Sequence, residues 1–155
     1  MINIEHEDKI LRNFILFFQT ARSAFKYADA HLYGKMRLST VKLIALQALV
    51  SNGGIMRPSE IAEWTQTERH NITTLIRRMK KEGLITTERD IYNKRNVNIT
   101  LTDKGKELYN RAMPVAKEVI DQIMHSITEE DAIHCDEMLT PIKEYRLAFL
   151  LISDH

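Results

Sequence analysis

Polar and basic side chains gather on one face of residues 69–81, and their types and spacing suit contacts with DNA. At about 100° per residue, these side chains lie opposite or beside an apolar stripe. Arginine pairs with guanine and asparagine with adenine through two hydrogen bonds each. Lysine and arginine also neutralise phosphates, which positions a protein but carries little sequence information. The DNA-binding residues expected here are Arg69, His70, Asn71, Thr73, Thr74, Arg77, Arg78 and Lys81.

Within this set, the N-terminal half of the helix is expected to contact bases, as in helix-turn-helix proteins. We assign Arg69, His70, Asn71 and Thr74 to bases, while Arg77 fits either task. We expect phosphate contacts from two residues nearer the end of the helix, Arg78 and Lys81.

A second basic feature follows at residues 89–95, where a hairpin tip carries Lys94 and Arg95. Such a tip fits the minor groove or the flanking phosphates. Between Thr67 and Arg95 the chain has eight lysines and arginines but four acids, although its total net charge is only +1. The alternative is that these charges simply form a solvated face; the adjacent hairpin favours a nucleic-acid surface.

The surrounding sequence predicts the elements that hold these side chains. Ile72, Leu75, Ile76 and Met79 have helical spacing, and residues 97–101 alternate as in a half-buried strand paired with 84–88. Pro58 begins a short preceding helix, with Ile61, Ala62 and Trp64 expected to face inward. Thr67 is expected to cap the basic helix and Gly83 to end it.

Two further helices are expected before these elements. The first covers residues 7 to about 32. The second is capped by Ser39 or Thr40 and ended by Asn-Gly-Gly at 52–54, after which residues 55–56 form a minimal strand.

After the hairpin, Thr102 is expected to cap a helix that reaches about residue 126, with a kink at Pro114. Another helix is expected to start at Thr128 and to be interrupted at Thr140-Pro141. Residues 147–152 are apolar on every side, and an exposed tail of this kind favours aggregation unless it is covered.

Composition and motifs narrow the function class. The 155 residues fit one domain, and they include no apolar run of 18 that would predict a membrane span. One cysteine suits a reducing cytoplasm. His134 and Cys135 are neighbours and therefore point in different directions on a helix, so Cys135 is expected to be a packing residue, with a redox role as the alternative. Neither a cofactor, a metal site nor an enzyme activity is predicted.

The sequence resembles the MarR family of bacterial transcriptional regulators over nearly its whole length. The segments that carry the resemblance are Ser59-Glu60-Ile61-Ala62, residues 75–85 and, most specifically, residues 93–105, where an alternating strand precedes Leu-Thr-x-x-Gly. Two departures are Asn93, where the family usually has aspartate, and the polar turn at 65–67, where it usually has apolar residues. The resemblance implies a mainly α fold with a small β-hairpin wing.

The resemblance also implies a homodimer, a palindromic DNA operator and often a small aromatic effector. We expect a single domain over 1–155, with a winged lobe at about 36–104 and dimerisation helices at about 5–33 and 105–153. A cytoplasmic repressor released by an aromatic or anionic ligand is the leading function. Its alternative is a winged-helix module that binds protein instead of DNA. The residues expected near an effector are Tyr27, Tyr33, Arg37 and Trp64.

Overall fold

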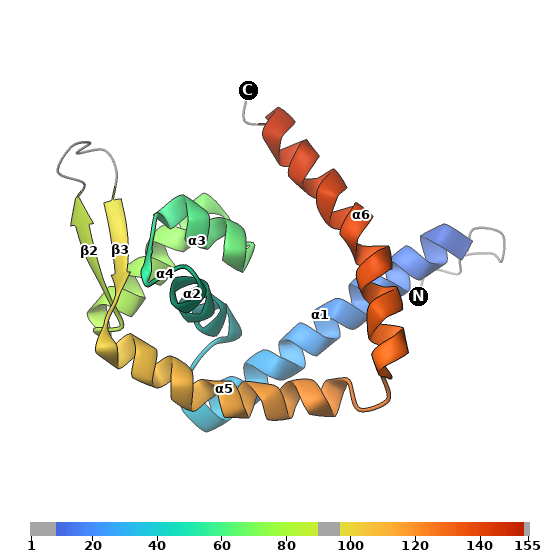
Figure 1. The fold of residues 1–155 in the computed structure, drawn as a ribbon, viewed down its shortest axis with the longest axis horizontal. Coiled ribbons are helices and arrows are strands. Elements are labelled where there is room, and N and C mark those ends of the chain that lie inside the picture. Colours follow the sequence, from blue (N-terminus) through green and yellow to red (C-terminus); the bar gives the residue numbers. More distant parts are fainter. Residues whose placement is uncertain (1–8, 90–96, 154–155) are drawn as a thin grey trace. The chain divides into compact units, whose positions relative to one another are not determined.

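The computed structural model describes residues 9–89 and 97–153, and for Arg69, Lys143 and 145–153 it describes the backbone alone. The chain is mainly helical with a small antiparallel sheet, as predicted (Figure 1). None of the described helices has the length and apolar character needed to cross a membrane. The elements are α1 (Lys9–Met36), α2 (Thr40–Ser51), β1 (Ile55–Met56), α3 (Pro58–Thr65), α4 (Arg69–Lys81), β2 (Ile85–Arg89), β3 (Val97–Leu101), α5 (Asp103–Ile123) and α6 (Glu129–Ser153).

The sheet has the strand order β1-β3-β2, with both pairs antiparallel. Ile55 pairs with Thr100, and Thr87 pairs with Ile99. Ile99 is fully buried, so the alternation of β3 directs its central apolar side chain into the lobe. Gly83 joins α4 to β2 with a φ of 72°, a conformation that glycine adopts without steric cost, and it ends α4 as predicted.

The core of the winged lobe lies between α2, α3, α4 and the sheet. α2 is central because one side packs on the helices and another on the strands, and it begins at Ser39, whose side chain accepts a hydrogen bond from the Lys42 N–H. The buried residues of this core are Ala45, Leu46, Ala48, Leu49, Met56, Ile61, Ile72, Met79, Leu84, Ile85 and Ile99.

A second apolar cluster fixes the C-terminal end of α1 to the start of α2 and to α5. It contains Leu32, Leu38, Leu43, Ala112 and Ala116. Two polar contacts reinforce it. The Asp29 carboxylate accepts the Thr40 N–H at 2.7 Å, and Lys35 pairs with Glu118 at 2.8 Å.

α5 begins in close contact with the sheet. The Thr102 hydroxyl donates to the Gly83 carbonyl at 2.7 Å and accepts the Gly105 N–H at 3.1 Å, which confirms Thr102 as the cap. A Cβ at position 105 would collide with the Leu84 carbonyl oxygen, so only glycine permits this approach. Pro114 lies inside α5, which continues past it.

The chain divides into two compact units, Met1–Ile120 and Asp121–His155. In the second unit, α6 begins with reciprocal bonds between Thr128 and Asp131: the Thr128 N–H donates at 2.9 Å and the Asp131 N–H donates at 3.1 Å. The Thr128 hydroxyl and then its N–H, which both donate to the Asp131 carboxylate, hold the pKa of Asp131 below its ordinary value, and the bonds confirm the start expected at Thr128. Cys135 is half-buried.

Four sequence expectations were wrong in detail. α1 continues to Met36, four residues beyond the predicted end. The indole of Trp64 is 47% exposed instead of facing inward, and Ile61 fills the core position on that helix. Thr67 does not cap α4, since its hydroxyl donates to the Thr65 carbonyl and Glu68 occupies the cap position. α6 runs through Thr140-Pro141 without interruption, where the Thr140 hydroxyl donates to the Asp136 carbonyl.

Candidate nucleic-acid interface

A tight turn between α3 and α4 determines where the candidate interface begins. Gln66 ends α3 in the left-handed conformation, with a φ of 53°, and the Thr67 N–H donates to the Ala62 carbonyl at 3.0 Å. The Asn71 and Ile72 N–H groups then bond to the Glu68 carbonyl and start α4. The turn is therefore held by main-chain bonds, which compensates for its polar sequence.

α4 is amphipathic, with the predicted apolar stripe facing the core. Ile72 and Met79 are buried, while Leu75 and Ile76 pack against the same core. Of the predicted DNA-binding side chains, His70, Asn71, Thr73, Arg77, Arg78 and Lys81 are exposed, and Thr74 is half-buried. The helix backbone includes Arg69, but its side chain lies outside the described residues. The structure thus presents the predicted polar face to solvent.

The charges on this face differ from other cations of the same unit. Within the described residues, Arg77, Arg78 and Lys81 form no ion pair, whereas Lys35, Lys42 and Arg57 each have a carboxylate partner. Lys35 pairs with Glu118 at 2.8 Å, Lys42 with Glu82 at 2.7 Å and Arg57 with Glu60 at 2.8 Å. The outward face of α4 therefore retains uncompensated positive charge.

Arg57 illustrates a paired cation. Its guanidinium and its own N–H both bond to the Glu60 carboxylate, and these bonds hold the pKa of Glu60 below its ordinary value of 4.5. His70 lies 3.3 Å from the Glu68 carboxylate, measured from Nδ1 to Oε2, and this pair is ionic only when the imidazole is protonated.

A hollow of about 610 Å³ lies beside α4. Asn71, Thr74 and Arg78 form one wall, and the start of α2 and the turn at 66–68 form the other. Asn71 and Arg78 therefore share one wall of this hollow. Ser39 and Gln66 were not predicted to line this surface, because their approach to α4 depends on the geometry of the turn.

The remaining predicted residues are placed separately. Lys94 and Arg95 lie outside the described residues. Tyr33 and Arg37 come together at the end of α1, with the guanidinium carbon 5.4 Å from the ring centroid, and Tyr27 contacts His31 at 5.3 Å between rings. Trp64 lies on α3; among the described residues, no hydrogen bond, ion pair or ring contact joins it to Tyr33 or Arg37. None of these four lines the hollow.

Comparison with known sequences places this segment in a family. Residues 38–95 match the sequence model of the MarR family. The homoprotocatechuate degradative operon repressor of Escherichia coli is 36% identical over 62 residues, which are 40% of this chain and 42% of the repressor. The curated relatives matched first are thus covered over less than half of their own length.

Solved structures extend the similarity to most of the chain. The organohalide-sensing regulator RdhR-CbdbA1625, solved with 2,4-dichlorophenol, is 25% identical with a TM-score of 0.78, covering 96% of this chain and 91% of that one. Sco3205 of Streptomyces coelicolor, solved with DNA, has the same fold at 20% identity and a TM-score of 0.81. The match covers 91% of this chain and 92% of Sco3205. The winged segment thus matches the model of the MarR family, and nearly the whole chain shares its fold with solved regulators of this kind.

Proposed function

We propose that the protein is a sequence-specific DNA-binding transcriptional regulator. The observation that carries this proposal is the unpaired positive charge of Arg77, Arg78 and Lys81 on the exposed face of α4. A helix of this kind fits the major groove, and unpaired cations gain by replacing the counterions of phosphates. A regulator that acts on chromosomal DNA in a bacterium works in the cytoplasm.

The position of a residue along α4 determines which contact we propose for it. Arg69, His70, Asn71 and Thr74 lie in its first half and are proposed to contact base edges, and Thr73 is a further proposed DNA contact on a flank of that face. Arg78 and Lys81 are proposed to hold phosphates, as are Lys94 and Arg95 of the wing, and Arg77 serves either role.

The proposed active form is a symmetric dimer on a palindromic operator. Several large apolar side chains of α1 are exposed, among them Ile10 at 84% and Phe14 at 61%. Covering each such side chain is worth about 1.5–3 kcal/mol, which favours a second copy as the cover. Two recognition helices would then meet half-sites about 34–36 Å apart. Repression is the proposed direction of control, in keeping with the repressor of Escherichia coli described above.

Release by a small aromatic or anionic ligand completes the proposal. The neighbour RdhR-CbdbA1625 was solved with 2,4-dichlorophenol, a planar aromatic molecule. In this chain Arg37 and Tyr33 already form a cation–aromatic contact, and Tyr27 and Trp64 are about half exposed. A ligand bound near Arg37 and Tyr33 lowers DNA affinity only if it prefers the conformation of the protein that does not fit DNA.

Selection of duplexes from a random pool tests the DNA-binding role. The expected result is enrichment of one inverted repeat, with Asn71→Ala or Thr74→Ala relaxing the preference at one position by about 1–3 kcal/mol. Arg78→Ala should weaken all sequences and reduce the slope of log affinity against log salt by about one. The matched control is Arg57→Ala, an exposed arginine already paired with Glu60, which should leave that slope unchanged. Failure to enrich any sequence would favour the protein-binding alternative.

A further inference from the structure

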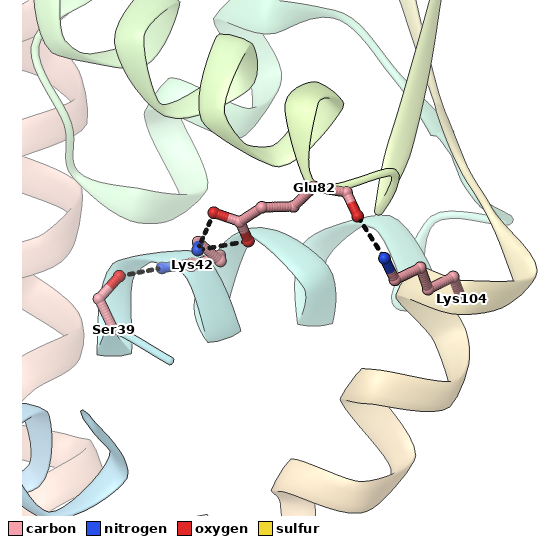
Figure 2. A network of polar contacts seen from close by, with 4 residues as sticks. All are labelled: Ser39, Lys42, Glu82 and Lys104. Atoms are coloured by element: carbon pink, nitrogen blue, oxygen red, sulfur yellow. Dashed lines mark hydrogen bonds and ion pairs between the residues drawn. The ribbon is translucent and has the colours of Figure 1, made fainter. Parts of the chain in front are cut away.

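A charged network joins the end of α4 to two other helices (Figure 2). The Glu82 carboxylate accepts two hydrogen bonds from Lys42 of α2, at 2.8 and 2.7 Å from Nζ to the two oxygens. The Glu82 main-chain carbonyl accepts a third from Lys104 of α5, at 2.7 Å. One residue at the end of the recognition helix is therefore bound to both neighbours.

The place of Glu82 makes this arrangement informative. It is the C-cap of α4, where the helix dipole already presents negative charge, so a carboxylate there is unfavourable without cations. Lys42 and Lys104 supply those cations from different elements. The lysines compensate a charge that α4 would not otherwise favour at its end.

Burial separates Lys42 from the cations proposed to contact DNA. Its side chain is only 12% exposed, whereas that of Glu82 is 46% exposed. Most of the Lys42 side chain is covered, so its charge has fewer water contacts than that of an exposed lysine, and the two bonds to Glu82 stabilise it. Lys42 is thus paired with Glu82, unlike Arg77, Arg78 and Lys81, which form no ion pair among the described residues.

A small tilt of α4 about its C-terminal end displaces the N-terminal end of the helix substantially. A helix of 13 residues is about 20 Å long, so a tilt of about 5° at its end moves the opposite end by more than about 1 Å. Of the proposed base contacts, Asn71 lies near that opposite end, while Thr74 lies near the middle of the helix and moves less. Hydrogen bonds to base edges weaken steeply when distance and angle change by this amount.

Resting on the proposed DNA-binding function, we propose that Lys42 and Glu82 are positioning residues for base recognition. Their pair holds α4 at the tilt that the base contacts require, and neither side chain contacts DNA itself. The pair acts on sequence discrimination, which distinguishes it from Arg78 and Lys81, proposed to act on all sequences alike.

The test measures the ratio of affinities for the duplex selected by the wild-type protein and for a random duplex. This ratio is insensitive to a loss of folded protein, since a smaller active fraction lowers both affinities equally. Lys42→Met and Glu82→Gln should each reduce the ratio at least about fivefold, comparable to losing one base contact. The double variant should lose no more than one single variant, because the two residues act as a unit.

Three controls sharpen this result. Lys42→Arg keeps the ion pair and should retain the ratio within about twofold. Lys35→Met breaks the exposed pair with Glu118, away from α4, and should leave the ratio unchanged. Lys42→Met should leave the salt slope unchanged, whereas loss of a phosphate contact lowers it by about one.

Glu82→Gln gives the most decisive outcome. If Glu82 acted only through its negative charge near DNA, its removal would strengthen binding to all sequences and would overturn the proposal. An unchanged ratio in both single variants, or a lowered salt slope in Lys42→Met, would also overturn it. If the wild-type protein selects no duplex at all, the proposed function itself fails, and the two failures remain distinguishable.

Discussion

The helices α1 and α2 are both rich in apolar residues, yet within the unit Met1–Ile120 α2 is largely buried and the N-terminal part of α1 is exposed. Ala45, Leu46 and Leu49 of α2 are fully buried, while Ile10 and Phe14 of α1 are mostly exposed. The difference arises because α2 lies between α3, the sheet and α5, whereas the N-terminal part of α1 extends beyond the second apolar cluster. The winged lobe thus buries its apolar residues within this unit, and the N-terminal part of α1 is the surface proposed to pair with a second copy.

The largest effect on stability is expected from Leu46→Ala in the core of the winged lobe. Its side chain is completely buried, so its removal should lower the free energy of unfolding by about 2–5 kcal/mol through lost burial and a residual cavity. Urea unfolding followed by circular dichroism measures this. Ile55→Ala, at a side chain 56% exposed, is the matched control and should cost less than about 1 kcal/mol. Equal costs for both variants would contradict the place of Leu46 in the buried core.

The complementary test concerns α1. Phe14→Ala should weaken the proposed dimer by about 1.5 kcal/mol for each copy of the ring, which raises the dimer dissociation constant about a hundredfold. Ser23→Ala on the same helix serves as the control and should leave the constant unchanged. Sedimentation over a range of micromolar concentrations measures both. A wild-type protein that sediments as a stable monomer would remove the basis of the comparison.

Asp29 of α1 accepts a hydrogen bond from the first residue of α2 and so links the two helices. Asp29→Ala removes the acceptor of the Thr40 N–H at the start of α2 and should cost about 1 kcal/mol of unfolding free energy. Asp29→Asn keeps an oxygen that accepts this bond and should cost less. Thermal unfolding of the two variants checks the order, and a larger loss in the asparagine variant would argue that the negative charge matters more than the hydrogen bond.

The smallest effect is expected at the Lys35–Glu118 pair between α1 and α5. The hydrogen bond and the charge of Lys35 lower the pKa of Glu118 from 4.5, so the pair contributes stability above that pH and loses it as pH falls through the lowered value. Both side chains are about half exposed, and salt should weaken the effect further. Glu118→Gln should make unfolding slightly less pH-dependent below about pH 4.5. Chemical unfolding at pH 3–6 would reveal no difference if the pair is ineffective.

Local patterns predicted most of the winged lobe. The caps at Ser39 and Thr102, Pro58 at the start of α3 and the alternation of β3 each depend on neighbours within a few residues, and all were confirmed. Thr67 failed as a cap because the left-handed Gln66 turns the chain one residue later than the sequence implied.

The parts of the site that sequence did not reveal depend on distant partners. Lys42 and Glu82 are forty positions apart, and their pairing follows from the packing of α2 against α4. Pro141 was expected to interrupt α6, yet tertiary context overrides such local preferences, as proline in a helix interior is costly but not prohibitive. The outward face of α4 was predictable because helical period alone separates it from the core.

The two-residue strand β1 has a consequence for how the lobe forms. The β2–β3 hairpin joins neighbouring segments, but Ile55 must find Thr100 across α3, α4 and β2, and the Leu101 N–H then bonds to the Gly54 carbonyl at 2.8 Å. Closing so long a loop costs chain entropy before any contact compensates for it. The helices and hairpin should therefore form early and β1 should join last, so the amide hydrogens of the β1–β3 pairing should exchange with solvent sooner than those of α2.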